Sequence, residues 1–575
     1  MLVEYQSGVA STNMDRFQRL IALCFIIGAS HGFRHYQDTI PNGDSVPHPC
    51  KNNFLWRGVG HKNPQGGGNR NPFGLDFQQV KQWTEELCQK DSDGDGLTNG
   101  QELGDPECVW HPGQFPQMTN NITHPGICDP WGSPKCTAKN DWVSCTAGEF
   151  VCNATKAPEV KSFTLRYPPT RVPPTETNYY CMPFDVSKYI DMSQDYHLIA
   201  TKPEINNTNV MHHIVLFGCN DDADLTDHPT PCYMSQKGCS EFLGLWTLGL
   251  DGICEYEEAG YRIGRSGSRK MVMQFHWTNP ELRSDYVDSS GMTIYYTPKL
   301  RKYDAGFLVT GQQYLEIPPG AKRSTFESTC TEECTNKLMK GNIYITSGLS
   351  HMHYLGYDEQ VELFRNGQTM TKVIDDPKYS YDTPQLKMYS TPIEMRQGDS
   401  LKTTCVYRSV SNTRTTLFGE GSYEEMCYGL FSFFPKENMT GSCVTWKNVD
   451  LCKFRDKTID GCDNEMFGNL SSPEMRLIVN EVMGSCNHYG PCRPECPAVL
   501  ARLNKHPCLQ GQLGEFLLHS FANGRDSDKI KFAHALRSCD MGADPADATY
   551  PISAARAASS VVPGMVVAAV LALGL

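Results

Sequence analysis

Cysteine is the residue type that most restricts what this chain can fold into. The 575 residues include 25 cysteines, and one of them, Cys24, lies in a short apolar run that follows Arg16 and Arg19 and ends in small residues. This arrangement is typical of a signal peptide, which we place at residues 1–32. Without that segment an even set of 24 cysteines remains, as expected for a disulfide framework formed in the secretory pathway.

Length and charge narrow the class of protein. A chain of 575 residues is too long for one core, and roughly 100–200 residues per domain suggests about three or four units. The net charge of −13 and the absence of basic runs argue against nucleic acid as a partner. Glycosylation sequons that fit the surface loops of a secreted protein begin at Asn121, Asn153, Asn206, Asn438 and Asn469.

The C-terminal end of the chain is apolar. Residues 561–575 carry no charge, and they supply about 15 apolar positions where a membrane-spanning helix needs roughly 20. Residues 546–575 therefore fit the cleaved signal of a lipid (GPI) anchor, and a plain hydrophobic tail is the alternative. We expect a protein of the secretory pathway, located outside the cell or at its surface, with membrane attachment if the anchor is used.

Residues 33–155 are rich in Gly, Pro and Asn and predict a small separate unit. Within it, residues 76–89 carry apolar side chains at helical spacing and predict one helix. The loop that follows, residues 91–102, fills every position of a calcium-loop template. Its candidate ligands are Asp91, Asp93, Asp95, the Leu97 carbonyl, Asn99 and Glu102. A solvated acidic turn is the alternative, and Pro106 leaves little room for a second helix.

The middle of the chain is dominated by short β patterns. Prolines between 158 and 174 mark residues 156–177 as a linker that cannot join a central strand. Strand patterns then appear at 214–217, 271–276, 292–296, 343–345 and 361–364, separated by Gly, Pro, Asn and Asp. We predict a mainly β chain with two β-sandwich domains, residues 178–305 and 306–446. A cysteine-rich tail at 447–545 has weak helical periodicity near 473–483 and 514–521.

Five histidines and one methionine carry the chemistry of the sequence. They are His212, His213, His276, His351, His353 and Met426. Imidazole suits copper in either oxidation state, whereas a thioether is a soft ligand that favours Cu(I) and is foreign to ordinary zinc sites. Redox chemistry at copper is therefore favoured over hydrolysis.

Strand geometry places conditions on these residues. Alternate side chains share a face of a strand, so His351 and His353 would project together while Met352 points away. The adjacent His212 and His213 cannot share a face of a regular strand, and they need a bulge or a strand end to do so. We therefore expect an irregular strand geometry at His212 and His213.

The remaining histidines and two methionines lack such contexts. His197, His228, His519 and His534 are expected to be ordinary polar or packing residues. Met273 and Met352 are expected to fill cores.

Residues from about 175 to 446 resemble the type II copper, ascorbate-dependent monooxygenases, the family of dopamine β-hydroxylase and peptidylglycine α-hydroxylating monooxygenase. The matching blocks stand in the family's order, and their wording is closer to the dopamine hydroxylase branch. They include TNYYC (177–181), MHHIVLFGC (211–219), EEAG (257–260), QFHWTNP (274–280), DSSG (288–291), YYTPKLR (295–301), DAG (304–306), IPP (317–319), SHMH (350–353) and EEMC (424–427).

The first unit resembles temptin, a small secreted pheromone-associated protein. The residues that carry this resemblance are PHPC (47–50), WRGVGH (56–61), RNPFG (70–74) and DGDGLTNGQELG (93–104). The likeness covers this unit alone and implies no particular activity.

The monooxygenase resemblance implies two copper ions and ascorbate as reductant. By resemblance His212, His213 and His276 hold the electron-storing copper, and His351, His353 and Met426 hold the copper at which dioxygen and substrate react. Implied disulfides are Cys181–Cys232, Cys219–Cys239, Cys330–Cys443 and Cys405–Cys427. Tyr407 is implied to lie near the second copper, although we expect a core tyrosine.

The reaction implied is hydroxylation of a C–H bond in a small aromatic amine or related phenolic compound. A peptidylglycine-type hydroxylase is the alternative within the family. A catalytically inactive, secreted temptin-like binding or signalling protein is a rival of another class. A zinc hydrolase is disfavoured by Met426 and by the lack of a general-base glutamate in a helical histidine motif.

Overall fold

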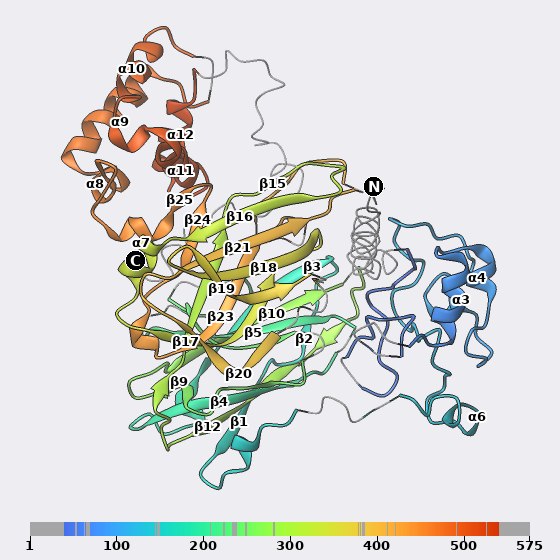
Figure 1. Cartoon of the computed structure of the whole chain (residues 1–575). Coiled ribbons are helices and arrows are strands. Elements are labelled where there is room, and N and C mark those ends of the chain that lie inside the picture. The colour runs from blue at the N-terminus through green and yellow to red at the C-terminus, as the bar shows by residue number, and fades with distance from the viewer. Residues whose placement is uncertain are drawn as a thin grey trace, which may run out of the picture. The chain divides into compact units, whose positions relative to one another are not determined.

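The computed structural model of the chain describes residues 39–539 and divides it into two compact units, Met1–Ala147 and Gly148–Leu575 (Figure 1). Positions within that span that are not described are 52–53, 63, 65–68, 144, 146–149, 208, 222, 224, 233–237, 248–249, 280–281, 378, 380, 382–383, 385, 411, 420, 422, 490–491 and 525. The predicted signal peptide (1–32) and lipid-anchor segment (546–575) lie outside the described residues. Across the described residues, no helix is long and apolar enough to cross a membrane.

The first unit is built from short helices and loops around a small apolar core. Its helices are α3 (Pro72–Val80), α4 (Glu85–Gln89), α5 (Asn99–Glu102) and α6 (Pro134–Thr137). The buried apolar side chains are Ile40, Val46, Trp56, Val59, Phe73, Leu87, Leu103 and Ile127. Three disulfides, Cys50–Cys145, Cys88–Cys108 and Cys128–Cys136, join its loops, as is typical of small secreted domains.

The single helix predicted over residues 76–89 is wrong, because the structure has two helices there. Lys81 has a left-handed backbone (φ 56°, ψ 18°) and ends α3, its N–H donating to the Phe77 carbonyl. Thr84 then begins α4, because its hydroxyl accepts a hydrogen bond from the Leu87 N–H. A left-handed residue after a helix is usually Gly or Asn, so a lysine gives no sign of the break.

The first β-sandwich holds the three histidines of the 212–276 region. One sheet has the order β1 (Lys161–Arg166), β12 (Gly291–Thr297), β4 (Asp195–Glu204), β9 (Ala259–Gly264), β13 (Tyr303–Asp304), with β8 (Ile253–Cys254) beside β4. The other has the order β6 (Thr230–Pro231), β3 (Thr177–Asp185), β10 (Lys270–Thr278), β5 (Met211–Cys219), β7 (Glu241–Thr247). Leu198 and Ile294 of one sheet share a core with Ile214 and Phe275 of the other.

The prediction that residues 156–177 form a linker is wrong for residues 161–166 and 170–171, which form the strands β1 and β2. β1 pairs with β12 along all of its 6 residues, and β2 (Thr170–Arg171) pairs with β11 (Val287–Asp288). β1 lies at the edge of its sheet and ends before Pro168, so no proline has to donate to a ladder. Leu165 of β1 is fully buried, and this burial favours the strand over an open linker.

The second β-sandwich follows the same plan. One sheet has the order β20 (Leu386–Met395), β17 (Ile343–His351), β23 (Cys427–Phe434), β14 (Gly306–Gln312), β24 (Cys443–Trp446), β25 (Val449–Asp450). The other has the order β16 (Ser324–Cys330), β21 (Ser400–Tyr407), β18 (Gly356–Arg365), β19 (Gln368–Asp376). Smaller elements are β15 (Glu316–Ile317) with β22 (Thr416–Leu417), the helix α7 (Glu332–Leu338), and the 3-10 helices η1 (Asn153–Lys156), η2 (Val186–Lys188) and η3 (Lys436–Asn438). The mainly β fold with two sandwiches and the five predicted strand cores are confirmed.

The two sandwiches pack directly against each other. The rings of Phe242 and Phe307 stack with centroids 3.9 Å apart, and the hydroxyl oxygens of Tyr261 and Ser432 lie 3.0 Å apart.

His197, expected to be an ordinary polar residue, is buried, and its Nε2 lies 2.8 Å from a carboxylate oxygen of Asp304. Met273 and Met352 are fully buried core residues, as predicted.

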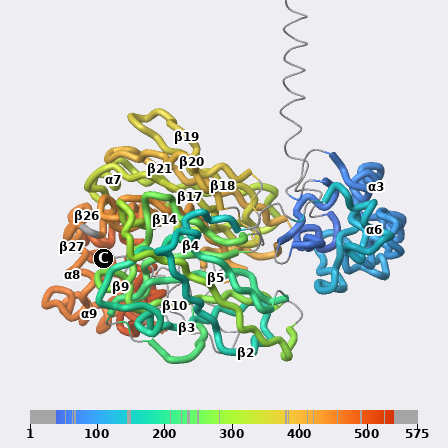
Figure 2. Tube along the Cα trace, turned by 90° about the horizontal axis from the view of Figure 1, so that it is seen from below, coloured from blue at the N-terminus to red at the C-terminus, as the bar shows by residue number. Residues whose placement is uncertain are grey.

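The cysteine-rich tail folds as a C-terminal helical segment, residues 451–539. Its elements are η4 (Leu451–Arg455), β26 (Thr458–Ile459), β27 (Cys462–Asp463), α8 (Asn464–Gly468), α9 (Pro473–Ser485), α10 (Cys496–Leu503), η5 (Pro507–Leu509), α11 (Gly511–Ala522) and α12 (Ser527–Leu536). Figure 2 shows α8 close to β26 and β27. The two predicted stretches of helical periodicity lie within α9 and α11.

All 24 cysteines among the described residues form disulfides, and the four pairs implied by the resemblance are present. The pairs of the second unit are Cys152–Cys254, Cys181–Cys232, Cys219–Cys239, Cys330–Cys443, Cys334–Cys452, Cys405–Cys427, Cys462–Cys508, Cys486–Cys496 and Cys492–Cys539. This complete pairing fits a protein made in the secretory pathway.

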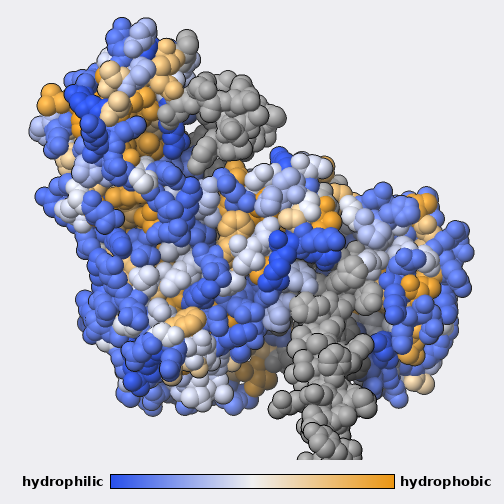
Figure 3. Space-filling model, turned by 45° about the horizontal axis from the view of Figure 1, so that its top comes forward, coloured by the Kyte–Doolittle hydropathy of each residue, from blue (hydrophilic) through white to orange (hydrophobic). Residues whose placement is uncertain are grey.

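Most of the surface in Figure 3 is hydrophilic, in keeping with the net charge of −13. The predicted glycosylation sites at Asn121, Asn153, Asn206 and Asn469 are exposed. Asn438 is half-buried, and its side-chain amide donates to the Asn342 carbonyl at 2.8 Å. Glycosylation stays a prediction at each of these sites.

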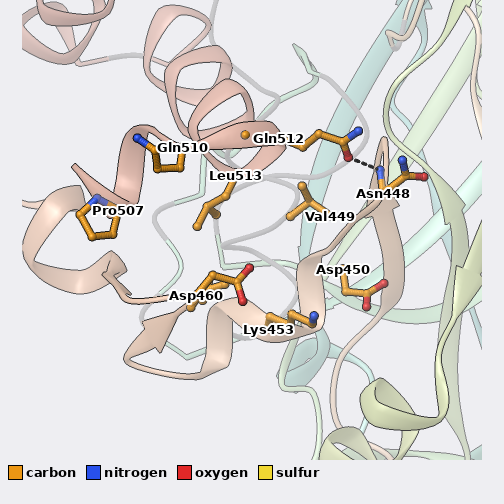
Figure 4. Close-up of a pocket in the computed structure, with 11 residues that line it drawn as sticks. Asn448, Val449, Asp450, Lys453, Asp460, Pro507, Gln510, Gln512 and Leu513 are labelled. Carbon is orange, nitrogen blue, oxygen red and sulfur yellow. Dashed lines mark hydrogen bonds between the residues drawn. The ribbon is translucent and has the colours of Figure 1, made fainter. Parts of the chain in front are cut away.

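The helical segment docks on the second sandwich through aromatic packing. Phe516 of α11 packs on Trp446 of β24, with ring centroids 5.6 Å apart, and within its own segment it packs on Phe454 of η4 at 4.9 Å. Beside this contact, the Asn448 N–H donates to Oε1 of Gln512 at 3.1 Å, which Figure 4 shows at the rim of a pocket of about 290 Å³. The segment is therefore part of the larger unit and not a loose appendage.

We predict that Phe516→Ala will destabilise the second unit by about 3–5 kcal/mol, because it leaves a cavity between the helical segment and the sandwich. Leu477→Ala on α9 is the matched control, since Leu477 is 73% exposed and should change stability by less than about 0.5 kcal/mol. Denaturant unfolding of both variants measures the difference. Equal effects in the two variants would contradict the docking.

Candidate metal centre

Three histidines converge where the neighbouring interior strands β10 and β5 end and begin. The ring centroids of His276 lie 4.6 Å from His212 and 4.8 Å from His213. One nitrogen of each ring lies within 4.8 Å of one nitrogen of both others. Tyr179 of β3 stacks on the His276 ring at 4.3 Å and holds it in place. We call these residues the three-histidine cluster.

A β-bulge lies at the adjacent histidines, one of the two irregularities that the sequence predicted there. His276 of β10 pairs with His213 of β5, but the next residue, Trp277, pairs with Met211. His212 is therefore the extra residue of the pair, and the alternation of side chains is broken at that point. Its Nδ1 lies 3.2 Å from Nδ1 of His213.

The cluster keeps its imidazoles neutral. Burial, with smaller contributions from His353 and His351, lowers the pKa of His212 to about 3. Burial also lowers the pKa values of His213 and His276 well below the ordinary range. Among the residues that the structure describes, neither ring nitrogen of His276 has a hydrogen-bond partner. A neutral imidazole with an unused nitrogen is the form in which histidine binds a metal.

The second pair of histidines lies where β17 ends. β17 stops at His351, so the prediction that His351 and His353 alternate along one strand is wrong. The backbone turns because the Met352 N–H donates to the hydroxyl of Tyr379 at 3.0 Å and the Met352 side chain enters the core. The two rings still converge, with centroids 5.6 Å apart and planes at 89°.

The residues on either side of Met426 tie its backbone to the segment that carries this pair. The Glu425 carboxylate accepts the N–H groups of His353 at 2.7 Å and Leu355 at 2.6 Å. Cys427, on the other side, is bonded to Cys405. The Met426 side chain is 2% exposed and belongs to the apolar core that includes Tyr428 and Trp446. We call His351, His353 and Met426 the methionine cluster.

The histidines of the methionine cluster, like those of the three-histidine cluster, have lowered pKa values. Burial lowers the pKa of His353 to about 4 and that of His351 well below its ordinary value. Burial raises the pKa of Glu425 to about 8, although the backbone N–H groups that it accepts oppose the shift. The His353 ring is oriented by the Glu424 carbonyl, 2.9 Å from its Nδ1.

Tyr381 lies between the two clusters. Its ring centroid is 4.6 Å from that of His212 and 5.5 Å from that of His353. The side chain is 4% exposed. The two clusters are therefore linked through one buried aromatic ring.

The sequence identified all six candidate ligands but missed the residues that position them. Glu425 lies inside the EEMC block directly before Met426, and this position in the sequence points to its role in positioning the site. Tyr381 lies in a loop after β19 and carries no sequence signal for its role. Tyr407 is fully buried, as expected of a core tyrosine, and its hydroxyl donates to the Met426 carbonyl at 2.6 Å.

The other histidines that the sequence analysis set aside lie elsewhere. His228 is exposed and pairs with the neighbouring Asp227, and the His519 ring packs on Trp446 at 5.5 Å. His534 is half-buried on α12. None of the three belongs to either cluster.

Three segments of the chain match known protein families. Residues 163–284 match the N-terminal domain of copper type II ascorbate-dependent monooxygenases, and residues 303–453 match the C-terminal domain. Residues 30–127 match the family Temptin C-terminal. The two monooxygenase matches contain all six candidate ligands.

Curated relatives point the same way. The chain is 32% identical over 300 residues to tyramine β-hydroxylase of Caenorhabditis briggsae, and the match covers 50% of this chain and 48% of the relative. It is 30% identical over 294 residues to dopamine β-hydroxylase of Rattus norvegicus, covering 49% and 47%. It is 27% identical over 295 residues to DBH-like monooxygenase protein 1 of Gallus gallus, covering 48% of each chain. The chain thus spans about half the length of these relatives.

Similarity to solved structures is low. A glycosylasparaginase, PNGase F of Flavobacterium meningosepticum, gives a TM-score of 0.22 at 8% identity over 48% of this chain and 94% of its own. This likeness carries no argument.

We predict that Glu425→Gln will weaken metal binding at the methionine cluster by roughly 10–100-fold, because only one acceptor oxygen would remain for two N–H donors. The three-histidine cluster should be unaffected. Copper titration against a competing chelator measures both affinities. Glu437→Gln, at an exposed carboxylate in η3, is the control, and equal losses in both variants would contradict the role of Glu425.

Proposed function

Since this chain belongs to the copper type II ascorbate-dependent monooxygenases through residues 163–284 and 303–453, we propose that it binds two copper ions and hydroxylates a C–H bond of a small organic substrate. In this proposal the three-histidine cluster holds one copper and the methionine cluster holds the other. When bound, copper supplies one-electron chemistry that activates dioxygen, with ascorbate as the reductant.

The observation that carries the proposal is the bulge at His212. It gathers three imidazoles with one nitrogen each inside 4.8 Å, all kept neutral by burial. Three neutral imidazoles suit copper as well as zinc, and the matches of residues 163–284 and 303–453 to copper type II monooxygenase domains favour copper.

The two clusters differ in their donors, and the difference supports a division of labour. Three imidazoles form a borderline donor set that tolerates both oxidation states of copper, whereas the thioether of Met426 favours the reduced state. Three protein ligands also leave room for a further ligand. We therefore assign electron storage to the three-histidine cluster and the reaction with dioxygen and substrate to the methionine cluster.

The chain's own residues would prepare this second cluster in three ways. Glu425 fixes the backbone of His353, and the Glu424 carbonyl fixes its ring. The Tyr407 hydroxyl fixes the backbone of Met426. The buried ring of Tyr381 lies beside the rings of both His353 and His212.

For the substrate we propose a small aromatic amine or a related phenolic compound. The relatives named as tyramine and dopamine β-hydroxylases, at 32% and 30% identity, support this class. A peptidylglycine-type hydroxylase is the second candidate within the family. A catalytically inactive binding or signalling protein would not need both clusters with neutral imidazoles, and a zinc hydrolase would not use Met426.

We also propose that the enzyme works outside the cell or in the secretory lumen, where ascorbate and dioxygen are its partners. The complete pairing of the described cysteines supports this location. Attachment through a C-terminal lipid anchor remains part of the proposal for residues 546–575.

Metal analysis of the purified protein should give two copper ions per chain. Met426→Ala should keep the copper of the three-histidine cluster but reduce turnover at least a thousandfold, because the oxygen-reacting copper loses its soft ligand. Met370→Ala, 51% exposed on β19, is the matched control and should turn over normally. One copper per wild-type chain, or full activity in Met426→Ala, would refute the assignment.

Oxygen uptake with ascorbate should depend on an aromatic amine such as tyramine or dopamine, and the product should carry a new benzylic hydroxyl group. Glycine-extended peptides should react at least tenfold more slowly. The measurement is oxygen consumption with product analysis by mass spectrometry. Release of glyoxylate from the peptides, without hydroxylation of the amines, would show that the peptide branch is the right one.

A further inference from the structure

The loop of residues 91–102 in the first unit is folded around its own carboxylates. The Asp91 carboxylate accepts N–H groups of Gly94 at 2.7 Å and Gly96 at 3.0 Å. Gly96 has φ +112°, a conformation that favours glycine and lets the chain curl over the acidic side chains. One oxygen each of Asp91, Asp93 and Asp95 lies within 4.8 Å of the other two.

Three further oxygen atoms of the loop are buried without a hydrogen-bond partner among the residues that the structure describes. They are Oδ2 of Asp93, Oδ1 of Asn99 and Oε2 of Glu102. Asp93 is 8% exposed, Asn99 is 0% exposed and Glu102 is 1% exposed. A buried carboxylate oxygen without a partner costs free energy, so these atoms indicate a missing positive group.

No lysine or arginine fills that role within the described part of the chain. Lys139 lies over the loop, but its Nζ donates to the Asp93 carbonyl at 2.7 Å and the Gly94 carbonyl at 2.8 Å. Lys135 likewise donates to the Asp95 carbonyl at 2.6 Å. The lysines therefore satisfy the outer, main-chain side of the loop and leave the carboxylates facing inward.

The carboxylates repel one another, and this repulsion needs a counter-charge. Burial, with the neighbouring Asp93 and Asp95, raises the pKa of Glu102 to about 9. Burial and the Asp95 charge raise the pKa of Asp93 to about 7. A bound cation would reverse both shifts.

We propose that residues 91–102 hold one Ca²⁺ through Asp91, Asp93, Asp95, Asn99 and Glu102, with the Leu97 carbonyl at the seventh position of the loop. Only oxygen donors are offered, and calcium accepts six to eight of them in flexible geometry. Magnesium is a poorer fit, because it prefers six donors in near-ideal octahedral geometry and keeps most of its water.

The site serves structure, since it ties distant parts of the first unit to one loop. Glu102 accepts the Thr123 hydroxyl at 3.0 Å, and Asp95 accepts the Asp129 N–H at 2.9 Å. The Asn99 side-chain amide donates to the carbonyl of Leu87 in α4. α5 has only 4 residues, so this is a calcium loop without the long second helix of a helix-loop-helix pair.

The test is calorimetric titration of the full chain with CaCl₂ after chelator treatment, with MgCl₂ as the competing probe. We expect one Ca²⁺ per chain and at least tenfold weaker Mg²⁺ binding. At a hundredfold excess of Ca²⁺ over its dissociation constant, backbone hydrogen exchange in residues 91–102 should slow by roughly a hundredfold. Met426→Ala should bind Ca²⁺ normally, which separates this site from the copper proposal.

Glu102→Gln and Asp93→Asn keep the shape of the loop and should each weaken Ca²⁺ binding at least a hundredfold. Glu107→Gln, at an exposed carboxylate just outside the loop, is the control and should bind as the wild type does. The proposal is overturned if the wild type takes up no Ca²⁺ at millimolar concentration with unchanged hydrogen exchange. It is also overturned if Glu107→Gln weakens binding as much as the two loop variants do.

Discussion

The three-histidine cluster depends on one extra residue in the pairing of β5 with β10. Side chains alternate along a strand, so two consecutive histidines can reach the same metal only if the alternation is interrupted. The step from His276 opposite His213 to Trp277 opposite Met211 is that interruption. Among the residues that the structure describes, both ring nitrogens of His276 are buried without a hydrogen-bond partner, each at a cost of about 1–3 kcal/mol. Copper binding would offset this cost, so folding of this part of the sheet and metal uptake should be coupled.

The methionine cluster is assembled in another way. His351 ends a strand, His353 lies in the turn beyond it, and Met426 stands just before a neighbouring strand. No regular element positions all three, so a buried carboxylate does so through backbone N–H groups. A buried carboxylate that accepts two such bonds is costly to disturb, because any loss leaves either the donor or the charge unsatisfied. The first cluster is held by a sheet and the second by Glu425.

The sequence predicted five strand cores and both sandwiches from the side-chain period, and it predicted a bulge or a strand end at His212 and His213 because two adjacent ligands need one. It failed where tertiary burial decided the local structure. Leu165 draws a proline-flanked segment into the sheet, and Lys81 interrupts a helix whose apolar spacing continues on both sides. His353 leaves the strand because the turn at Met352 is fixed by the distant Tyr379. Local patterns do not contain these contacts, so only the folded chain reveals them.

Tyr381 joins the two clusters into one centre. It follows β19 in the second sandwich, yet its ring lies 4.6 Å from that of His212 in the first and 5.5 Å from that of His353 in its own. The contact between Tyr381 and His212 therefore joins the two sandwiches and opposes their separation at this point. Moving them apart would expose an aromatic side chain that is now 4% exposed, at a cost of about 1.5–3 kcal/mol. The separation of the clusters is thus set by packing between the domains as well as by the ligands themselves.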